Sequence, residues 1–440
     1  MHLFIVGAGY VGLTTALGFG ELGHDCTVQD IDPGRVEMLQ LGRSPLLEAG
    51  LEDALAAGIR DGRLRFTTAS APPPETEVAL VCVPTPTGAH GLLDLSTVED
   101  VAARLIAALP SAATIVVRST LPLHGPDRLE ALAAPGARPA LVVNPEYLRE
   151  GRALQDFRAP TRVTVGWVDP ADQAAARRFA ALYEPLGAPI VVADARSVVL
   201  TKLASNVFLA LKVAFANELA RLSDASGADY PTVADGVGLD PRIGRAFLDA
   251  GPGYGGSCLP EQAETIALET ERRDVEAPLL RAIAVSNRAH QAAIVASMEG
   301  AIPGGLSGAR IGLLGLAFKA GTNDVRHAPG LALAALLRSR GARVVAYDPV
   351  ANAAASVADP RLQTADSAAA AARDADALVI ATEWPAFAAL DWSELGSAMR
   401  GKLVLDTRRV LDAGQVRAAG LTYVALGRVR EPGVSGAPVD

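Results

Sequence analysis

Cys258 lies in the segment of the sequence that is best suited to covalent chemistry. It follows the run Gly253-Tyr254-Gly255-Gly256-Ser257, and Pro260 comes two residues later. Glycine permits tight turns and proline is favoured in the first turn of a helix, so this pattern places Cys258 at a helix N-terminus. The partial positive charge there favours the nucleophilic thiolate. Two interpretations stay open on these residues alone: an activated nucleophile, or a small buried side chain beside a turn.

The N-terminal stretch has the spacing of a dinucleotide-binding site. Residues 2–6 predict a buried strand, the run Gly7-Ala8-Gly9-Tyr10-Val11-Gly12 opens a helix, and residues 26–30 predict a second strand that ends in an acid. Gly7 makes the turn, Gly9 lets the backbone approach a pyrophosphate, and Gly12 lets the helix pack on the strand. The acid, Asp30, can bind ribose hydroxyls and repels a 2′-phosphate, which predicts NAD rather than NADP. A purely structural glycine turn is the alternative, and Arg35 either contacts the adenosine end or is solvated.

Polar residues follow the next predicted strands. Strands are predicted at 78–83, 114–117, 141–143 and 161–168, and the first three are followed by Pro84-Thr85-Pro86-Thr87-Gly88, Arg118-Ser119-Thr120 and Asn144-Pro145-Glu146-Tyr147-Leu148-Arg149-Glu150. The carboxyl ends of strands in a doubly wound sheet meet at the edge where ligands bind. We therefore expect these segments to face a ligand, although each could be an ordinary loop cap.

A long helix is predicted from residue 197 to about 224, with no proline or glycine inside. Its length suggests a spine between two domains. Lys202 and Asn206 are four residues apart and share one face of this helix. The ordinary interpretation of such a pair is a solvated surface feature.

A second α/β unit follows the linker-like residues 302–305. Its strands are predicted near 311–315, 343–347, 377–381 and 403–405. It has no second G-x-G-x-x-G motif, but Lys319 and Arg326 follow its first strand, and such a basic pair suits a phosphate or nucleotide. The Pro/Gly-rich residues after about 428 are expected to be frayed.

The composition limits the function classes. A chain of 440 residues predicts two or three domains, and a net charge of −9 argues against nucleic acid as the main partner. Cys26 and Cys82 lie in apolar runs and are expected in the core. The three cysteines have no metal-ligand spacing, so no metal site is predicted and a reducing compartment is expected. No signal peptide or membrane-spanning run is recognised, so the sequence predicts a cytoplasmic protein.

Taken together, the motifs resemble the UDP-glucose/GDP-mannose dehydrogenase family over essentially the whole chain, to about residue 428. They are G-x-G-Y-V-G at 7–12, N-P-E-Y-L-R-E-G at 144–151, K-L-A-S-N at 202–206, G-Y-G-G-S-C-L-P at 253–260 and G-L-A-F-K…D-V-R at 315–326. Arg242, in G-L-D-P-R-I-G, and the sequence around Glu150 are similar to the UDP-glucose branch.

The resemblance implies two Rossmann-like doubly wound parallel-sheet domains joined by a long central helix. The implied domains are an NAD-binding domain at 1–196, a central helical domain with the nucleophile loop at 197–300 and a nucleotide-sugar-binding domain at 301–440. A homodimer through the central helix is also implied.

The resemblance further implies a mechanism. NAD takes a hydride from C6 of the sugar, Cys258 attacks the resulting aldehyde to give a thiohemiacetal, and a second NAD takes another hydride to leave a thioester. Glu150 activates the water that hydrolyses the thioester to UDP-glucuronate, and Thr120 holds this water. Lys202 and Asn206 steady the developing oxyanion.

The implied binding residues form two sets. The cofactor set is Gly7, Gly9, Tyr10, Val11, Gly12, Asp30, Arg35, Thr85, Thr87, Ser119, Thr120, Glu150 and Arg326. The substrate set is Glu146, Tyr147, Leu148, Arg149, Lys202, Asn206, Arg242, Tyr254, Gly255, Lys319 and Arg408.

The sequence departs from the family beside the nucleophile. The family usually has Cys-x-Pro-Lys-Asp, whereas this chain has Glu261 and Gln262 in the last two positions. A nearby anion disfavours the thiolate, and Gln262 can hold a water but cannot take its proton. We therefore expect a slower or altered second half-reaction. The alternatives are a single oxidation, another nucleotide sugar, or a non-catalytic nucleotide-sugar-binding paralogue.

Overall fold

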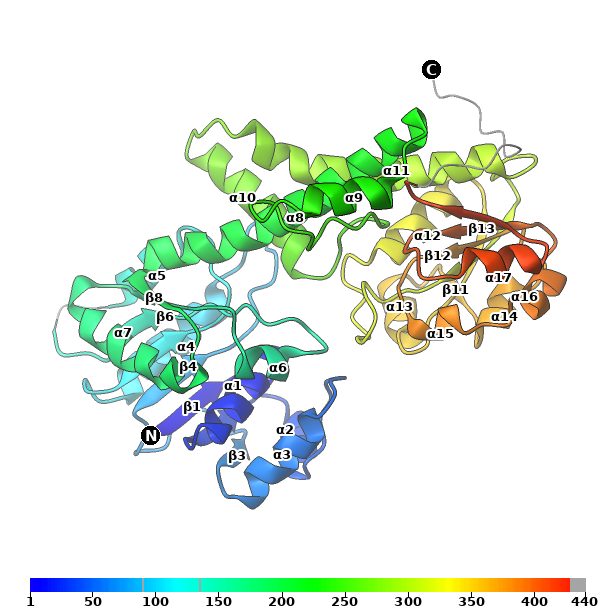
Figure 1. The fold of residues 1–440 in the computed structure, drawn as a ribbon. Coiled ribbons are helices and arrows are strands. Elements are labelled where there is room, and N and C mark those ends of the chain that lie inside the picture. Colours follow the sequence, from blue (N-terminus) through cyan, green and yellow to red (C-terminus); the bar gives the residue numbers. More distant parts are fainter. Residues whose placement is uncertain (89–90, 134–135, 428–440) are drawn as a thin grey trace. The chain divides into compact units, whose positions relative to one another are not determined.

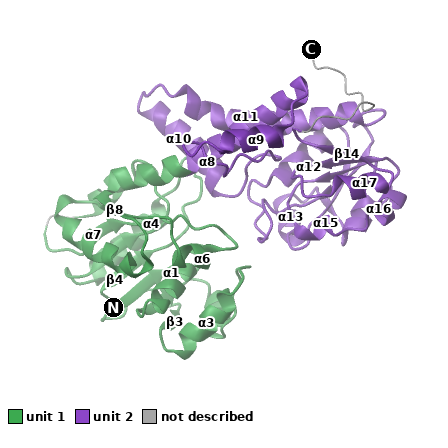
Figure 2. Ribbon diagram, viewed as in Figure 1, with its two compact units in different colours: residues 1–205 green, residues 206–440 purple. Residues whose placement is uncertain are grey.

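The computed structural model describes residues 1–88, 91–133 and 136–427. Contacts divide the chain into two compact units, residues 1–205 and residues 206–440 (Figure 2). The expected fraying after residue 428 lies outside the described residues.

The first unit is an eight-stranded sheet with the order β3-β2-β1-β4-β5-β6-β7-β8 (Figure 1). Neighbouring strands are parallel except β6 and β7, which are antiparallel. The strands are β1 (His2–Val6), β2 (Asp25–Gln29), β3 (Leu64–Thr67), β4 (Val78–Val81), β5 (Thr114–Val117), β6 (Ala140–Val143), β7 (Val163–Trp167) and β8 (Ile190–Asp194). The helices are α1 (Tyr10–Glu21), α2 (Pro33–Gln40), α3 (Leu51–Arg60), α4 (Ser96–Ala108), α5 (Gly125–Leu132), α6 (Ala153–Arg158), α7 (Gln173–Ala180) and the beginning of α8 (Ala195–Ser226).

The second unit contains a six-stranded parallel sheet with the order β11-β10-β9-β12-β13-β14. Its strands are β9 (Arg310–Leu314), β10 (Arg343–Tyr347), β11 (Gln363–Thr364), β12 (Ala377–Ile380), β13 (Leu403–Asp406) and β14 (Thr422–Ala425). The rest of α8 and three further helices precede the sheet: α9 (Tyr230–Gly238), α10 (Cys258–Arg272) and α11 (Pro278–Ala301). The remaining helices are α12 (Pro329–Ser339), α13 (Asn352–Ala358), α14 (Ala368–Ala372), α15 (Pro385–Ala388), α16 (Trp392–Ala398) and α17 (Ala413–Ala418).

Apolar residues on both faces of the second sheet explain why its strands are continuous hydrophobic runs. Neighbouring residues of one strand point to opposite faces. Leu313 packs in a cluster with α11 and α12, while Leu314 packs in a cluster with α14 and α16. The helices therefore cover both faces, and the predicted doubly wound fold is confirmed.

In both sheets the chain turns at a glycine directly after the first strand. Gly7 follows β1 with φ 101°, and Gly315 follows β9 with φ 106°. A Cβ on Gly12 would lie 1.8 Å from the carbonyl oxygen of Gly7, and a Cβ on Gly330 would lie 2.3 Å from that of Gly315. In each sheet the strand order reverses at the first strand, because later strands of the chain lie on both sides of it. Doubly wound sheets bind ligands at such a switch point.

Helix α8 begins in the first unit and ends in the second. Among the described residues it alone has the length and apolar composition of a candidate membrane span, and 39% of its most apolar window is buried. Its Ala216 and Ala220 pack with Tyr230 and Ala234 in an apolar cluster of the second unit. Part of its apolar composition is thus explained by core packing.

Candidate active site

The turn after β1 leaves room for a ligand only at its middle glycine. A Cβ on Gly7 would lie 2.5 Å from the carbonyl oxygen of Cys82, so both Gly7 and Gly12 are required by packing. A Cβ on Gly9, by contrast, would meet nothing within 4 Å. Gly9 is the N-cap of α1, and no side chain caps the first N–H groups of this helix. Open space at the N-cap and a helix N-terminus without a side-chain cap fit a pyrophosphate.

The first residues of α1 flank this space. Tyr10 and Val11 are partly buried, and the Tyr10 hydroxyl donates to the carbonyl of Leu47 at 3.4 Å. The predicted cofactor residues of the glycine turn therefore lie together.

Asp30 follows β2 and is 6% exposed. Its Oδ2 accepts from the Ala8 N–H at 2.8 Å and from Arg35 Nη1 at 3.1 Å, while Oδ1 accepts from the Asp32 N–H at 3.0 Å. The carboxylate therefore fixes the glycine turn and holds Arg35 beside it. A carboxylate oxygen has about two acceptor sites, so Oδ1 retains capacity for a ribose hydroxyl.

The segments after β4 and β5 are tied together. The Ser119 hydroxyl donates to the carbonyl of Val83 at 2.7 Å, which joins the ends of these strands. Thr120 and Thr85 are partly buried, and Thr87 is exposed. The Ser119 hydroxyl thus forms a structural bond, and Thr120 follows it after the carboxyl end of β5.

Lys202 is buried, contrary to its ordinary interpretation as a solvated residue. Its side chain is 5% exposed, and its Nζ lies 3.2 Å from Glu146 Oε1 and 2.5 Å from the Glu146 carbonyl oxygen. Glu146 Oε2 accepts from the Leu148 N–H at 2.5 Å. A cavity of about 10 Å³, enough for one water molecule, is lined by Lys202 and Ser119.

The residues after Glu146 are held in different ways. Tyr147 donates to or accepts from the Thr164 hydroxyl at 3.1 Å, and its ring lies 3.8 Å from the Arg162 guanidinium carbon. Arg149 forms a two-pronged ion pair with Asp156, at 2.6 and 2.9 Å. Glu150 is partly buried in the following turn. Arg149 therefore has a partner of its own within the first unit.

In the second unit, Cys258 is the first residue of α10 and is exposed. Cys26 and Cys82 are instead buried, and burial raises the pKa of each thiol to about 12. The predicted placement of Cys258 at a helix N-terminus and the predicted burial of the other two thiols are confirmed. The exposed thiol is the one available as a nucleophile.

The two residues that depart from the family pattern point in different directions. Gln262 is 3% exposed, and its Oε1 accepts from Asn206 Nδ2 at 3.0 Å. Glu261 lies 4.0 Å from His327 Nε2, and burial raises the pKa of its carboxyl group. Gln262 therefore orients the α8 amide, while Glu261 lies beside the segment that contains Arg326.

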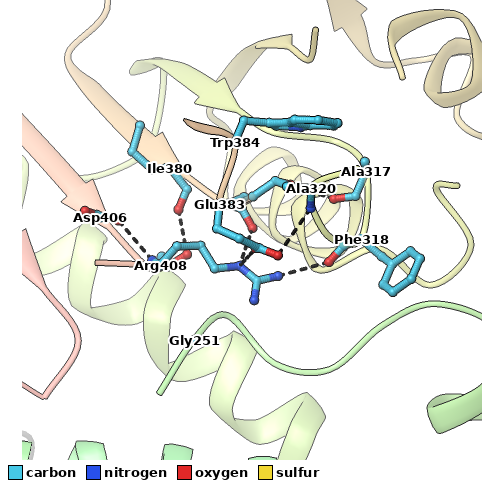
Figure 3. A network of polar contacts seen from close by, with 12 residues as sticks. Gly251, Ala317, Phe318, Ala320, Ile380, Glu383, Trp384, Asp406 and Arg408 are labelled. Atoms are coloured by element: carbon cyan, nitrogen blue, oxygen red, sulfur yellow. Dashed lines mark hydrogen bonds and ion pairs between the residues drawn. The ribbon is translucent and has the colours of Figure 1, made fainter. Parts of the chain in front are cut away.

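Arg408 follows β13 and is held at the carboxyl edge of the second sheet (Figure 3). Its Nε donates to the Ala381 carbonyl at 3.0 Å and lies 3.1 Å from Glu383 Oε2, and its Nη2 donates to the Phe318 carbonyl at 3.1 Å. A Cβ on Gly251 would lie 3.5 Å from Nη1. Burial lowers the pKa of Arg408, and Glu383 opposes this effect.

The other predicted basic residues have contacts of their own. The Lys319 ammonium is 5.5 Å from the ring centre of Phe318, the residue whose carbonyl Arg408 binds. Arg326 pairs with Asp324 at 2.6 Å and is 56% exposed. Arg242 is 88% exposed and pairs with Asp240 at 2.6 Å. Lys319 and Arg408 therefore both contact Phe318, at its ring and at its carbonyl, whereas Arg242 projects into solvent.

Tyr254 and Gly255 have packing roles in the second unit. Tyr254 is 6% exposed, and burial raises the pKa of its hydroxyl to about 12. A Cβ on Gly255 would lie 2.5 Å from the His327 carbonyl oxygen. Gly255 thus allows two segments of the unit to approach closely.

The structure groups the predicted residues by unit. The first contains the glycine turn, Asp30 and the Lys202–Glu146 pair, and the second contains Cys258, Asn206 and the Arg408 network. No pattern in the sequence indicates Glu383 as a partner of Arg408, or Gln262 as the partner of Asn206. The direct contact of Glu146 with Lys202 was also not predicted.

Comparison with known proteins identifies the family. The NAD-binding-domain model of the UDP-glucose/GDP-mannose dehydrogenase family matches residues 1–187, its central-domain model residues 196–289, and its UDP-binding-domain model residues 312–413. A UDP-glucose 6-dehydrogenase of Rhizobium meliloti is 38% identical, over 97% of this chain and 100% of that relative.

Solved structures agree with this assignment. A UDP-glucose dehydrogenase of Pyrobaculum islandicum is 35% identical with a TM-score of 0.85, over 96% of both chains. A UDP-D-ManNAc dehydrogenase of Pyrococcus horikoshii is 26% identical with a TM-score of 0.83, over 97% of this chain and 99% of that chain. The predictions of the fold, the NAD cofactor and a dehydrogenase activity are confirmed. The chain belongs to the UDP-glucose/GDP-mannose dehydrogenase family.

Proposed function

We propose that this chain oxidises UDP-glucose at C6 to UDP-glucuronate in two steps through a covalent adduct on Cys258. The observation that carries the proposal is the position of Cys258 at the start of α10, four residues before Gln262, which bonds to Asn206. Asn206 in turn is four residues, about one helical turn, from Lys202 on α8. A thiol, an amide and an ammonium are the groups that a thiohemiacetal route requires.

Cys258 attacks the C6 aldehyde that the first oxidation leaves, and the adduct stays on the enzyme until the second oxidation. NAD, bound at the glycine turn, supplies the hydride acceptor for each oxidation. The exposure of Cys258 and its place at a helix N-terminus both favour this attack.

Lys202 stabilises the oxyanion that develops at C6. An ammonium group has three N–H donors, and the carbonyl and carboxylate of Glu146 occupy two. The third donor is then available for the substrate oxygen. Asn206, oriented by Gln262, contributes the second donor to the same oxygen.

Water that hydrolyses the thioester needs a base, and Gln262 cannot act as one. The resemblance implies that Glu150 is this base, and we propose it in this role. Glu146 is a second candidate, because its carboxylate contacts the Lys202 ammonium. Thr120 directly follows Ser119, which lines the small cavity beside Lys202, and in this proposal it holds the water.

Lys319 and Arg408 bind the nucleotide diphosphate in this proposal. Lys319 follows β9 at the switch point of the second sheet, and Arg408 follows β13, two strands away at the same carboxyl edge. Two cations at this edge suit two phosphates. Arg242, Tyr147, Leu148 and Arg149 remain proposed substrate contacts, and Arg326 a proposed contact of NAD. We further propose a cytoplasmic location and a homodimer.

The decisive experiment counts NADH formed per UDP-glucose consumed and identifies the product by mass spectrometry. We expect two NADH and UDP-glucuronate, and we expect Cys258→Ser to abolish the second NADH. One NADH with a released aldehyde or a protein-bound adduct would show that Glu261 and Gln262 have changed the second half-reaction. The double variant Glu261→Lys/Gln262→Asp should then restore two NADH.

A different substrate is tested in the same assay. The likeness to a UDP-D-ManNAc dehydrogenase makes UDP-N-acetylmannosamine the appropriate competitor. A higher kcat/KM with that sugar would reject UDP-glucose as the preferred substrate. Binding of both nucleotide sugars without any NADH would support a non-catalytic paralogue.

A further inference from the structure

Buried polar side chains hold the backbone of the loop that leads into the nucleophile helix. The Gly251 N–H donates to Asn217 Oδ1 at 2.8 Å, and the Gly251 carbonyl accepts from His290 Nε2 at 2.8 Å. The Tyr254 N–H donates to Asn287 Oδ1 at 3.0 Å, and Asn287 Nδ2 donates to the Tyr254 carbonyl at 3.3 Å. Gly251 is therefore bonded to α8 and α11, and Tyr254 is bonded to α11.

The α11 side chains of this set lie on one face of the helix. Asn287, His290 and Gln291 are spaced i, i+3 and i+4, and Gln291 Nε2 donates to the Pro252 carbonyl at 3.4 Å. All three are less than 9% exposed. One helix face thus binds the backbone of three loop residues.

The tautomer of His290 follows from its partners. Arg221 Nη1 lies 2.7 Å from His290 Nδ1, and a guanidinium group has donors only. Nδ1 must therefore accept, so the proton of the neutral ring is on Nε2, which donates to Gly251. Arg221 selects the tautomer that the loop needs.

One end of this loop borders a cavity. An open cavity of about 550 Å³ is lined by Tyr254, Asn287 and Gln291 together with Pro260 and Glu264 of α10. Tyr254 is the loop residue that borders this space, while residues 251–254 are all buried. Packing and the hydrogen bonds of the α11 face therefore hold the loop together.

We propose that His290, with its tautomer selected by Arg221, is a positioning residue that sets the loop between Arg408 and Cys258. Gly251, which His290 binds, lies against Arg408, and the loop runs from there into the first residue of α10. The inference rests on the proposed function, because it assigns Arg408 to substrate and Cys258 to the nucleophile. His290 acts through the loop and does not touch the reacting atoms in this proposal.

Three variants separate the bonds of His290. His290→Gln keeps a donor near the position of Nε2, so the bond to Gly251 can form. His290→Asn keeps an acceptor near the position of Nδ1 for Arg221 but loses the donor to Gly251. His290→Leu removes both bonds. We expect His290→Leu and His290→Asn to lower kcat about 10–100-fold, as for displaced reacting groups and their supports. His290→Gln should stay within about threefold of the native enzyme.

A second readout does not depend on turnover. The rate of Cys258 alkylation by iodoacetamide is measured against pH by peptide mass spectrometry. We expect a displaced pH profile in His290→Asn and His290→Leu, and an unchanged one in His290→Gln. The control is His2→Gln, which alters another buried histidine, bonded to Thr27 in the first unit, and should leave kcat and the profile unchanged.

The outcomes separate the two proposals. A folded Asn or Leu variant with native kcat and a native alkylation profile would overturn the positioning role. A lower melting temperature with both readouts unchanged would also overturn it, because His290 would then be merely structural. If the native chain oxidises no nucleotide sugar, the proposed function fails, while the alkylation profiles still decide the role of His290.

Discussion

Lys202 is a buried ammonium group whose charge is balanced by the carboxylate of Glu146. Removing one member of such a pair leaves the other as an uncompensated buried charge, which costs about 3–5 kcal/mol, whereas neutralising both costs much less. Stability and catalysis therefore respond differently to these two side chains. This difference makes the pair a direct test of the role proposed for Lys202.

Lys202→Met is expected to lower the free energy of unfolding by about 3 kcal/mol and kcat by about 10²–10³-fold. The double variant Lys202→Met/Glu146→Gln should regain most of the stability but none of the activity. Urea unfolding and steady-state NADH formation measure the two effects. Equal stability of the single and double variants would argue against a charge pair, and recovery of kcat in the double variant would exclude Lys202 as the oxyanion donor.

In both sheets an aspartate after the second strand accepts backbone N–H donation from the turn after the first strand. The other partners of the two aspartates differ. Asp30 accepts from Ala8 and is paired with Arg35, which is partly exposed. Asp348 accepts from two N–H groups of the turn after β9, two N–H groups of its own turn, and the Trp384 indole at 3.0 Å. At 1% exposure, Asp348 is saturated by protein donors, whereas Asp30 keeps acceptor capacity for a ribose.

Asp30→Asn and Asp348→Asn form a matched pair for this element. Each replaces a carboxylate that accepts backbone N–H groups, so each should lower the free energy of unfolding by about 1–3 kcal/mol. Only Asp30→Asn should raise KM for NAD, about tenfold, and narrow the preference for NAD over NADP. Thermal unfolding and cofactor titrations check this. Similar changes of the NAD KM in both variants would mean that Asp30 acts through stability alone.

The strands missed by sequence analysis are all edge strands. β3 and β8 end the first sheet, and β11 and β14 end the second. Edge strands are covered on fewer sides, so residues such as Arg65 in β3 are exposed and interrupt the apolar run that marks a central strand. The central strands and the long helix, found as Ala195–Ser226, were predictable because their apolar patterns are continuous.

The residues of the candidate site also divide into those that the sequence predicts and those that it does not. Motifs identified Cys258 and the glycine turn because backbone geometry depends directly on those residue types. The burial of Lys202 and the Asn206–Gln262 bond were not predictable, because each depends on residues 56 positions away in sequence. Tertiary packing, which no local pattern encodes, created both contacts.

An assembly of two chains would bury an apolar stripe on the second-unit part of α8. Phe208, Phe215 and Leu222 are 60%, 47% and 62% exposed and are spaced seven residues apart. This spacing puts them on one side of the helix, as in a helix–helix seam. Ala216 and Ala220 of the same helix instead pack in the core of the second unit. The stripe therefore supports the proposed homodimer through α8.

Phe208→Glu/Phe215→Glu is expected to weaken that dimer at least about a hundredfold, because each phenylalanine buried at the seam contributes about 2 kcal/mol and charges would replace both. Sedimentation velocity over a range of protein concentrations measures the dissociation constant. Val357→Glu is the control, since Val357 is an 83% exposed apolar residue of α13. A double variant that stays dimeric would place the interface elsewhere, and a native chain that is monomeric at every concentration would remove the homodimer from the proposal.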